Sequence, residues 1–189
     1  MSLDSKTDFE DSQKIIDKTV SWLETIVIGL NLCPFAKAVH TKKQIRYVVT
    51  QSVSSDELLK ILKSELKSLH ATNPNVADTT LIIHPQCLKD FLDYNEFLQV
   101  AENAIAQIGL EGVLQLASFH PQYQFAGSEP DAIDNYTNRS PYPMLHILRE
   151  ASVSKAVELF PEAVMIPANN VETMNTLGFE KLKKLLDTF

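Results

Sequence analysis

The sequence lacks the features that tie a protein to nucleic acid or to a membrane. Its 24 Asp and Glu outnumber its 17 Lys and Arg, the net charge is −7, and lysines are interspersed with acids instead of forming a basic face. No apolar run reaches the roughly 18 residues that span a bilayer. The longest, residues 26–32, is interrupted by Gly29 and Asn31. We therefore expect neither a nucleic-acid partner nor membrane insertion.

Cysteines are scarce as well, and motifs for targeting or metal binding are missing. The two cysteines, Cys33 and Cys87, do not form a CxxC pair, and the five histidines show no HxH or HExxH spacing. Residues 1–11 are polar and acidic, unlike a signal peptide. We expect a cytoplasmic protein with reduced thiols, and no motif indicates a cofactor.

Apolar periodicity predicts strands and helices in alternation. Connections of this length, each containing a helix, favour parallel strands with right-handed crossovers. We predict an α/β fold in which a small, mainly parallel β-sheet with a β-α-β-α-β core is flanked by helices. The predicted segments, in chain order, are a helix at 11–30, a strand at 45–53, a helix at 55–69, a strand at 79–83, a helix at 86–108 and a strand at 113–119.

The length of the chain indicates one domain. With 189 residues, of which 44% are hydrophobic, it is large enough to bury a core. We assign residues 11–189 to a single α/β domain and residues 1–10 to a flexible N-terminal tail. A long ordered loop is expected after the third strand, followed by helices near 144–150, 152–160 and 171–187.

Two of the predicted strands run into the same dipeptide. His84-Pro85 follows the strand at 79–83, and His120-Pro121 follows the strand at 113–119. Parallel strands would bring both imidazoles to the carboxyl edge of the sheet, where open α/β sheets bind ligands. His120 is then a candidate catalytic acid–base group with His84 as its partner. The alternative is that each His-Pro pair only ends its strand, with the ring bonded to a backbone carbonyl.

The polar segment after His120 is rich in side chains that bind anions. Arg139 and Arg149, two of only three arginines, lie ten residues apart, and a guanidinium grips carboxylate or phosphate at two points. If residues 144–150 are helical, His146 and Arg149 share one face, and Ser140 caps the helix. The alternative is that Arg149 is a surface charge and Arg139 only ties the loop down. The predicted substrate-binding residues are Arg139, Arg149, Asn135, Thr137, Ser140, His146 and Tyr123.

Cys33 precedes Pro34 at a predicted helix start, a position that activates a thiol. It is a candidate nucleophile with a strand-end histidine as its base. The alternative is a small apolar residue buried in a turn. A different possibility is a metal-dependent hydrolase site, for which His84, His120 and His146 are the candidate ligands.

Three stretches of the sequence resemble the bacterial domain-of-unknown-function 1415 family. They are NLCPFA at residues 31–36, FHPQYQF at residues 119–125, and residues 135–150. The similarity extends from about Val20 to about Leu177. The resemblance implies a bacterial cytosolic protein, but it implies no activity or cofactor, so no residue role is carried over from the family.

The residue chemistry favours an enzyme that acts on a small anionic metabolite, a phosphate or a carboxylate. Histidines would transfer protons, the arginines would hold the anion, and the aromatic, proline-rich loop at 121–143 would close over it. A non-catalytic binding module, with that loop as its partner surface, is the alternative from another class. Neither the reaction class nor the oligomeric state follows from the sequence.

Overall fold

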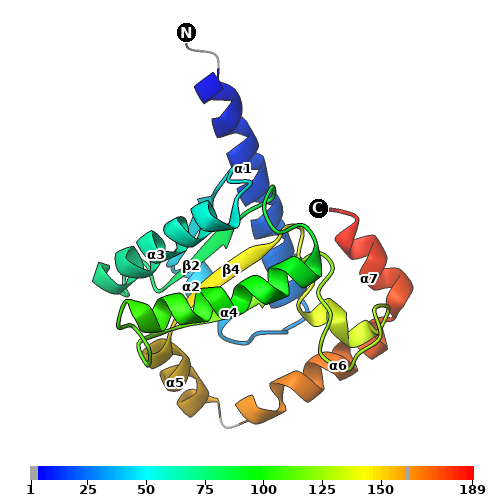
Figure 1. The fold of residues 1–189 in the computed structure, drawn as a ribbon. Coiled ribbons are helices and arrows are strands. Elements are labelled where there is room, and N and C mark those ends of the chain that lie inside the picture. The colour runs from blue at the N-terminus through cyan, green and yellow to red at the C-terminus, as the bar shows by residue number, and fades with distance from the viewer. Residues whose placement is uncertain (1–3, 161) are drawn as a thin grey trace.

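The computed structural model describes residues 4–160 and 162–189, and the side chains of residues 12–160 and 162–189 (Figure 1). One four-stranded sheet forms its centre, in the order β1-β2-β4-β3. β1 pairs with β2 in parallel, whereas β4 runs antiparallel to both β2 and β3. The strands are β1 (Ile45–Val49), β2 (Thr79–Ile83), β3 (Leu114–Phe119) and β4 (Met144–Arg149).

The α/β class is confirmed, but the prediction of a mainly parallel sheet is wrong, because residues 144–149 form a strand instead of a helix. β4 lies between two strands, and Leu145 and Ile147 face one core while Met144 faces the other. A strand buried on both faces has no alternating pattern, so its short apolar run resembles one turn of a buried helix.

Two helices cover one face of the sheet, α3 (Ser55–Ala71) and α4 (Phe91–Gln107), as Figure 1 shows in front of the strands. Their leucines and aromatic rings pack on Ile82, Leu145 and Ile147 in a continuous apolar core. α4 begins later than predicted because Asp90 caps it, accepting hydrogen bonds from the N–H groups of Leu92 and Asp93. This face of the sheet is therefore filled by side chains.

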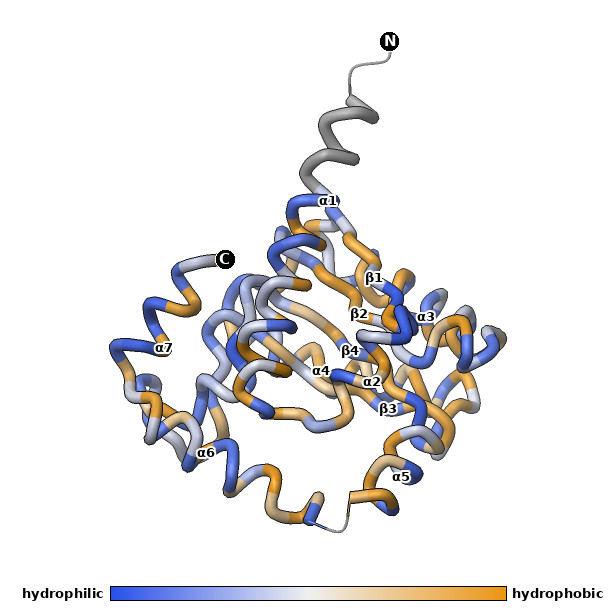
Figure 2. Tube along the Cα trace, turned by 180° about the vertical axis from the view of Figure 1, so that it is seen from behind, coloured by the Kyte–Doolittle hydropathy of each residue, from blue (hydrophilic) through white to orange (hydrophobic). Residues whose placement is uncertain are grey.

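The opposite face, seen in Figure 2 with hydrophobic positions in orange, is covered by the chain ends and short helices. Trp22, Leu23, Ile26 and Val27 pack there on Leu81, Ile83 and Met144. The covering elements are α1 (Asp4–Trp22), the π-helix η1 (Leu23–Ile28), α2 (Ala36–Thr41), α5 (Glu150–Leu159), α6 (Ile166–Leu177) and α7 (Phe179–Leu186), with short 3₁₀ turns at Ile133–Thr137 and Ala163–Met165.

The helices near the two chain ends have other bounds than those predicted. α1 begins at Asp4, inside the segment predicted to be a tail, of which residues 1–3 lie outside the described residues. The helix predicted at 171–187 is two helices that meet at Gly178, whose φ is 79°. Among the described residues, no helix combines the length and the apolar character needed to cross a membrane.

The first predicted helix changes its hydrogen bonding at Leu23, where α1 passes into the π-helix η1. The N–H of Gly29 closes this turn by donating to the carbonyl of Glu24 at 2.9 Å. A Cβ atom at Gly29 would lie 2.3 Å from the carbonyl oxygen of Thr25. The wide turn therefore requires glycine at this position, and π-turns inside helices occur frequently near functional sites.

We predict that Gly29→Ala lowers the free energy of unfolding by about 1–3 kcal/mol, because the backbone must shift to relieve this contact. In an ordinary α-helix the same change is stabilising, by up to about 1 kcal/mol. Urea unfolding measures the difference, with Ser21→Ala as the exposed helical control. A gain in stability for Gly29→Ala would show that the turn is not as tight as described.

Candidate functional site

The two strand-end histidines come together at the carboxyl edge of the sheet. β2 and β3 run in the same direction although β4 separates them. Tyr94 of α4 lies between the two rings, 5.9 Å from the centroid of His84 and 5.0 Å from that of His120. Both imidazoles are 0% exposed, so the convergence predicted from the sequence occurs inside the core.

Backbone carbonyls bind both rings. Nδ1 of His84 donates to the carbonyl of Cys87 at 2.9 Å, and Nε2 of His84 is buried without a partner among the described residues. Nε2 of His120 donates to the carbonyl of Leu88 at 3.1 Å, and its Nδ1 accepts from the N–H of Gln122. This is the bonding expected of histidines that end strands. Burial lowers the pKa of His84 to about 4 and also lowers that of His120, so both are neutral near pH 7.

Tyr94 connects the edge of the sheet to α4. Its hydroxyl donates to the carbonyl of Met144 at 2.7 Å and accepts from the N–H of Phe119 at 3.1 Å. These two groups belong to adjacent strands at the point where their pairing ends. Tyr94 therefore satisfies two backbone groups that would otherwise be buried without partners.

We predict that Tyr94→Phe lowers the free energy of unfolding by about 1–3 kcal/mol, because it leaves the Phe119 N–H and the Met144 carbonyl without the hydroxyl. Tyr47→Phe is the matched control, since the Tyr47 hydroxyl is buried and has no partner among the described residues. Its removal should leave stability unchanged or raise it. Equal losses for both variants in urea unfolding would contradict this role of Tyr94.

The predicted anion-binding residues of the loop bond to the loop itself. Nη2 of Arg139 donates to the carbonyl of Pro130 at 2.7 Å, and the guanidinium lies 4.3 Å from the centre of the Tyr136 ring. Oδ1 of Asn135 accepts from the N–H of Phe125 at 2.9 Å, and the side chain is fully buried. These contacts hold the segment 121–143 in shape.

Three further predicted binding residues also bond or pack locally. Oγ1 of Thr137 donates to the carbonyl of Asp134 at 2.8 Å, and Oγ of Ser140 donates to that of Tyr142 at 2.7 Å. Ser140 caps no helix, because a strand follows it. Tyr123 packs on the rings of Phe91 and Phe125.

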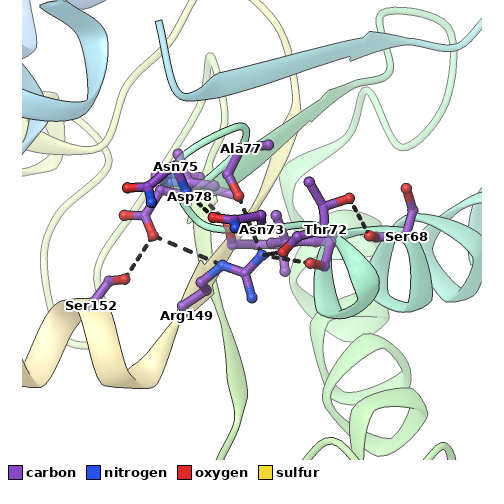
Figure 3. Close-up of polar contacts among 12 residues, drawn as sticks. Ser68, Thr72, Asn73, Asn75, Ala77, Asp78, Arg149 and Ser152 are labelled. Carbon is purple, nitrogen blue, oxygen red and sulfur yellow. Dashed lines mark hydrogen bonds and ion pairs between the residues drawn. The ribbon is translucent and has the colours of Figure 1, made fainter. Parts of the chain in front are cut away.

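Arg149 lies at the opposite edge of the sheet from the two strand-end histidines, because β4 is antiparallel. Figure 3 shows its polar contacts with Asp78 and with the end of α3. Its Nη2 donates to the carbonyls of Leu69 and Thr72, each at 2.6 Å. Its Nε lies 3.8 Å from Oδ1 of Asp78, which also accepts from the hydroxyl of Ser152 at 2.7 Å. Arg149 therefore closes the end of α3, and the structure does not bring it together with Arg139 into the predicted clamp.

A large cavity lies on the face of the sheet opposite α3 and α4. Its volume is about 530 Å³, and its walls are mainly apolar. The sheet forms the floor, α5 one wall, and η1 with the segment from Cys33 to Val39 the other. Phe35 and Phe160 meet edge to face at 6.1 Å between these walls. Floor residues include Ile45, Thr79, Leu81, Ala117, His146 and Leu148.

His146 is the imidazole that borders this cavity. Oγ1 of Thr79 lies 2.5 Å from its Nε2 and 2.6 Å from the carbonyl oxygen of Ile147. The side chain is half-buried, and it lines the cavity. Burial lowers its pKa to about 4, which makes the ring neutral near pH 7. The helical face that His146 was predicted to share with Arg149 does not exist, because residues three apart in a strand point to opposite sides.

The comparison with known proteins identifies the family. Residues 14–184 match the model of a family described as protein of unknown function, DUF1415. The chain belongs to the DUF1415 family. No curated protein and no solved structure matches it.

The structure does not bring the three candidate metal ligands of the DUF1415 protein together. His84 and His120 meet at the carboxyl edge, whereas His146 borders the cavity. Among the described residues, no group of three or more His, Cys, Asp or Glu side chains is placed to hold a metal ion. Cys33 also borders the cavity, away from the two histidines that were its predicted bases.

Sequence reasoning missed most of the residues that border the cavity. Gln115, Ala117 and Phe119 alternate along β3 and all face it, and Thr79 orients His146. A polar Gln115 within an apolar strand is a signal that the sequence did contain. The apolar walls give no such signal, because an apolar residue that borders a cavity cannot be told from a packed one in a sequence.

We predict that the stability of this DUF1415 protein falls as the pH is lowered from about 6.5 toward 4. In the unfolded chain His84 and His146 bind protons near pH 6.5. In the folded chain their pKa values are about 4, so they bind protons only when the pH falls to about 4. Each histidine contributes a slope of at most about 1.4 kcal/mol per pH unit in that window, and above pH 7 its contribution is constant.

Urea unfolding at intervals from pH 5 to 8 measures this slope. His146→Gln should reduce it, and His70→Gln, which changes an exposed histidine, should leave it as in the unmodified protein. Identical slopes for all three proteins would show that His146 is not held neutral by the fold.

Proposed function

We propose that this protein binds a mainly apolar small molecule in the cavity between the sheet and α5. One observation carries the proposal: a cavity of about 530 Å³ with apolar walls has a half-buried imidazole on its floor. Ligand sites in proteins have this size and this composition, a hydrophobic hollow with a few fixed polar groups. Transfer of an apolar ligand from water into such a site is favourable by roughly 25 cal/mol per Å² buried.

The polar groups at one end of the cavity are balanced in charge. Asp78 and Arg149 are paired, and His146 is neutral near pH 7. Nη2 of Arg149 donates to backbone carbonyls, and its buried Nε, which makes no hydrogen bond among the described residues, lies 3.8 Å from Oδ1 of Asp78. An uncharged ligand suits this end better than an anion does, because a buried charge without a partner is costly.

An enzyme that acts on a small anionic metabolite stays a prediction. The observation in its favour is that Cys33 and His146 border one cavity, which is the combination that nucleophilic catalysis requires. No residue of the predicted lid at 121–143 lines this cavity. Residues of α5 form the wall that the lid was expected to provide.

The partner-binding module receives less support from the geometry. It requires an exposed patch formed by the aromatic residues of the loop. Instead, Tyr123 packs on Phe91, with ring centroids 5.3 Å apart, and Tyr136 is buried against Phe179 at 5.5 Å. The rings stabilise the loop against α4 and α7.

Trp22, the single tryptophan of the chain, borders the cavity and reports on its contents. We predict that bromobenzene, an apolar molecule with a heavy atom that quenches fluorescence, quenches Trp22 saturably with one site per chain. A ligand that binds the folded state should also raise the melting temperature.

Ala117→Leu tests the position of this site, because the larger side chain occupies part of the cavity floor. We expect it to weaken bromobenzene binding at least tenfold. Ala106→Leu, the same change at an exposed position of α4, should leave binding unchanged. Linear, unsaturable quenching in the unmodified protein, or full binding by Ala117→Leu, would overturn the proposed function.

A further inference from the structure

We propose that the ligand of this cavity is an uncharged alcohol with a hydrocarbon body, whose hydroxyl donates a hydrogen bond to Nδ1 of His146. The proposal rests on the proposed function and deepens it by naming the class of ligand. It depends on the hydrogen-bond partners of His146, on the position of its ring in the cavity, and on the charges nearby.

The hydrogen bonds of Thr79 decide which nitrogen of His146 carries the proton. Oγ1 of Thr79 lies 2.6 Å from the carbonyl oxygen of Ile147, and a carbonyl only accepts. The single hydroxyl hydrogen of Thr79 is therefore used there. The contact between the same Oγ1 and Nε2 of His146, at 2.5 Å, then requires that Nε2 donates. In a neutral imidazole the other nitrogen, Nδ1, is left as an acceptor.

Nδ1 of His146 has no protein donor within the part of the chain that the structure describes. This nitrogen is not fully buried, and His146 lines the cavity, so a ligand bound there can reach it. Ala117 lies opposite His146 on β3, and its short side chain leaves the floor open at this point. An acceptor without a protein partner that borders an apolar cavity favours a ligand that brings a donor.

The surroundings favour an alcohol over a carboxylate. A carboxylate has only lone pairs to present to Nδ1, which is itself an acceptor. The cation that borders the same cavity, Arg149, donates to three backbone carbonyls, and the carboxylate of Asp78, 3.8 Å from its Nε, balances its charge. The walls beyond this end are apolar, with Leu81, Leu148 and Val153 among them, and they suit a hydrocarbon body.

Four small molecules with one phenyl ring separate the contributions of the body and the polar group. Benzyl alcohol offers a donor, benzyl methyl ether only an acceptor, benzoate a charge, and toluene neither a hydrogen-bonding group nor a charge. Each competes with bromobenzene for the quenching of Trp22. We expect benzyl alcohol to compete at concentrations at least tenfold lower than benzyl methyl ether or benzoate.

Two kinds of variant locate the source of this preference. His146→Phe keeps a flat ring but removes the acceptor, so benzyl alcohol and benzyl methyl ether should then bind within about twofold of each other. Thr79→Val removes the group that fixes the proton on Nε2 and should reduce the preference, whereas Thr79→Ser should retain it. His70→Phe, at an exposed histidine, is the control.

The outcomes separate this inference from the proposed function. If bromobenzene and toluene bind but benzyl alcohol shows no advantage over its methyl ether, the cavity binds ligands and the inference is wrong. The inference is also wrong if the advantage persists in His146→Phe. If bromobenzene, toluene and benzyl alcohol all fail to bind the folded protein, the proposed function itself fails, and the inference fails with it.

Discussion

The antiparallel pairing of β4 between β2 and β3 is the constraint on which the rest of the structure depends. It separates the two strands that end in His-Pro, and the space between their histidines is filled by the ring of Tyr94. The same pairing places Arg149 at the far edge of the sheet, where it closes α3, and leaves His146 on the face opposite α3 and α4. One strand therefore determines how His84, His120, His146 and Arg149 lie relative to one another.

The two faces of the sheet differ in how they are covered. α3 and α4 fill one face with leucines and aromatic rings, which form one of the two apolar clusters of the protein. On the other face, short helices and the chain ends leave a cavity between η1, the segment after it and α5. Burial of apolar area on the packed face stabilises the fold. This stability offsets the cost of an unfilled apolar cavity on the other face, where Nδ1 of His146 is the hydrogen-bond acceptor on the floor.

The sequence predicted the strand at Thr79–Ile83 and the meeting of His84 and His120 at one edge, because both follow from local patterns and strand direction. It did not predict β4, since this six-residue strand, apolar except for His146 and Arg149, carries no periodicity that separates strand from helix. Arginine chemistry suggested an anion site, whereas Arg139 and Arg149 bond to backbone carbonyls that only the folded chain brings near. The cavity depends on how far α5 stands from the sheet, which no local pattern encodes.

The most direct test of the account is the position of a bound alcohol in a crystal. Crystals soaked in 4-bromobenzyl alcohol reveal the bromine by its anomalous scattering and the hydroxyl by its density. The account predicts one bromine among the apolar walls between the sheet and α5, with the hydroxyl within hydrogen-bond distance of Nδ1 of His146. Bromine bound instead beside His84 and His120, or found only on the outer surface of the molecule, would contradict it.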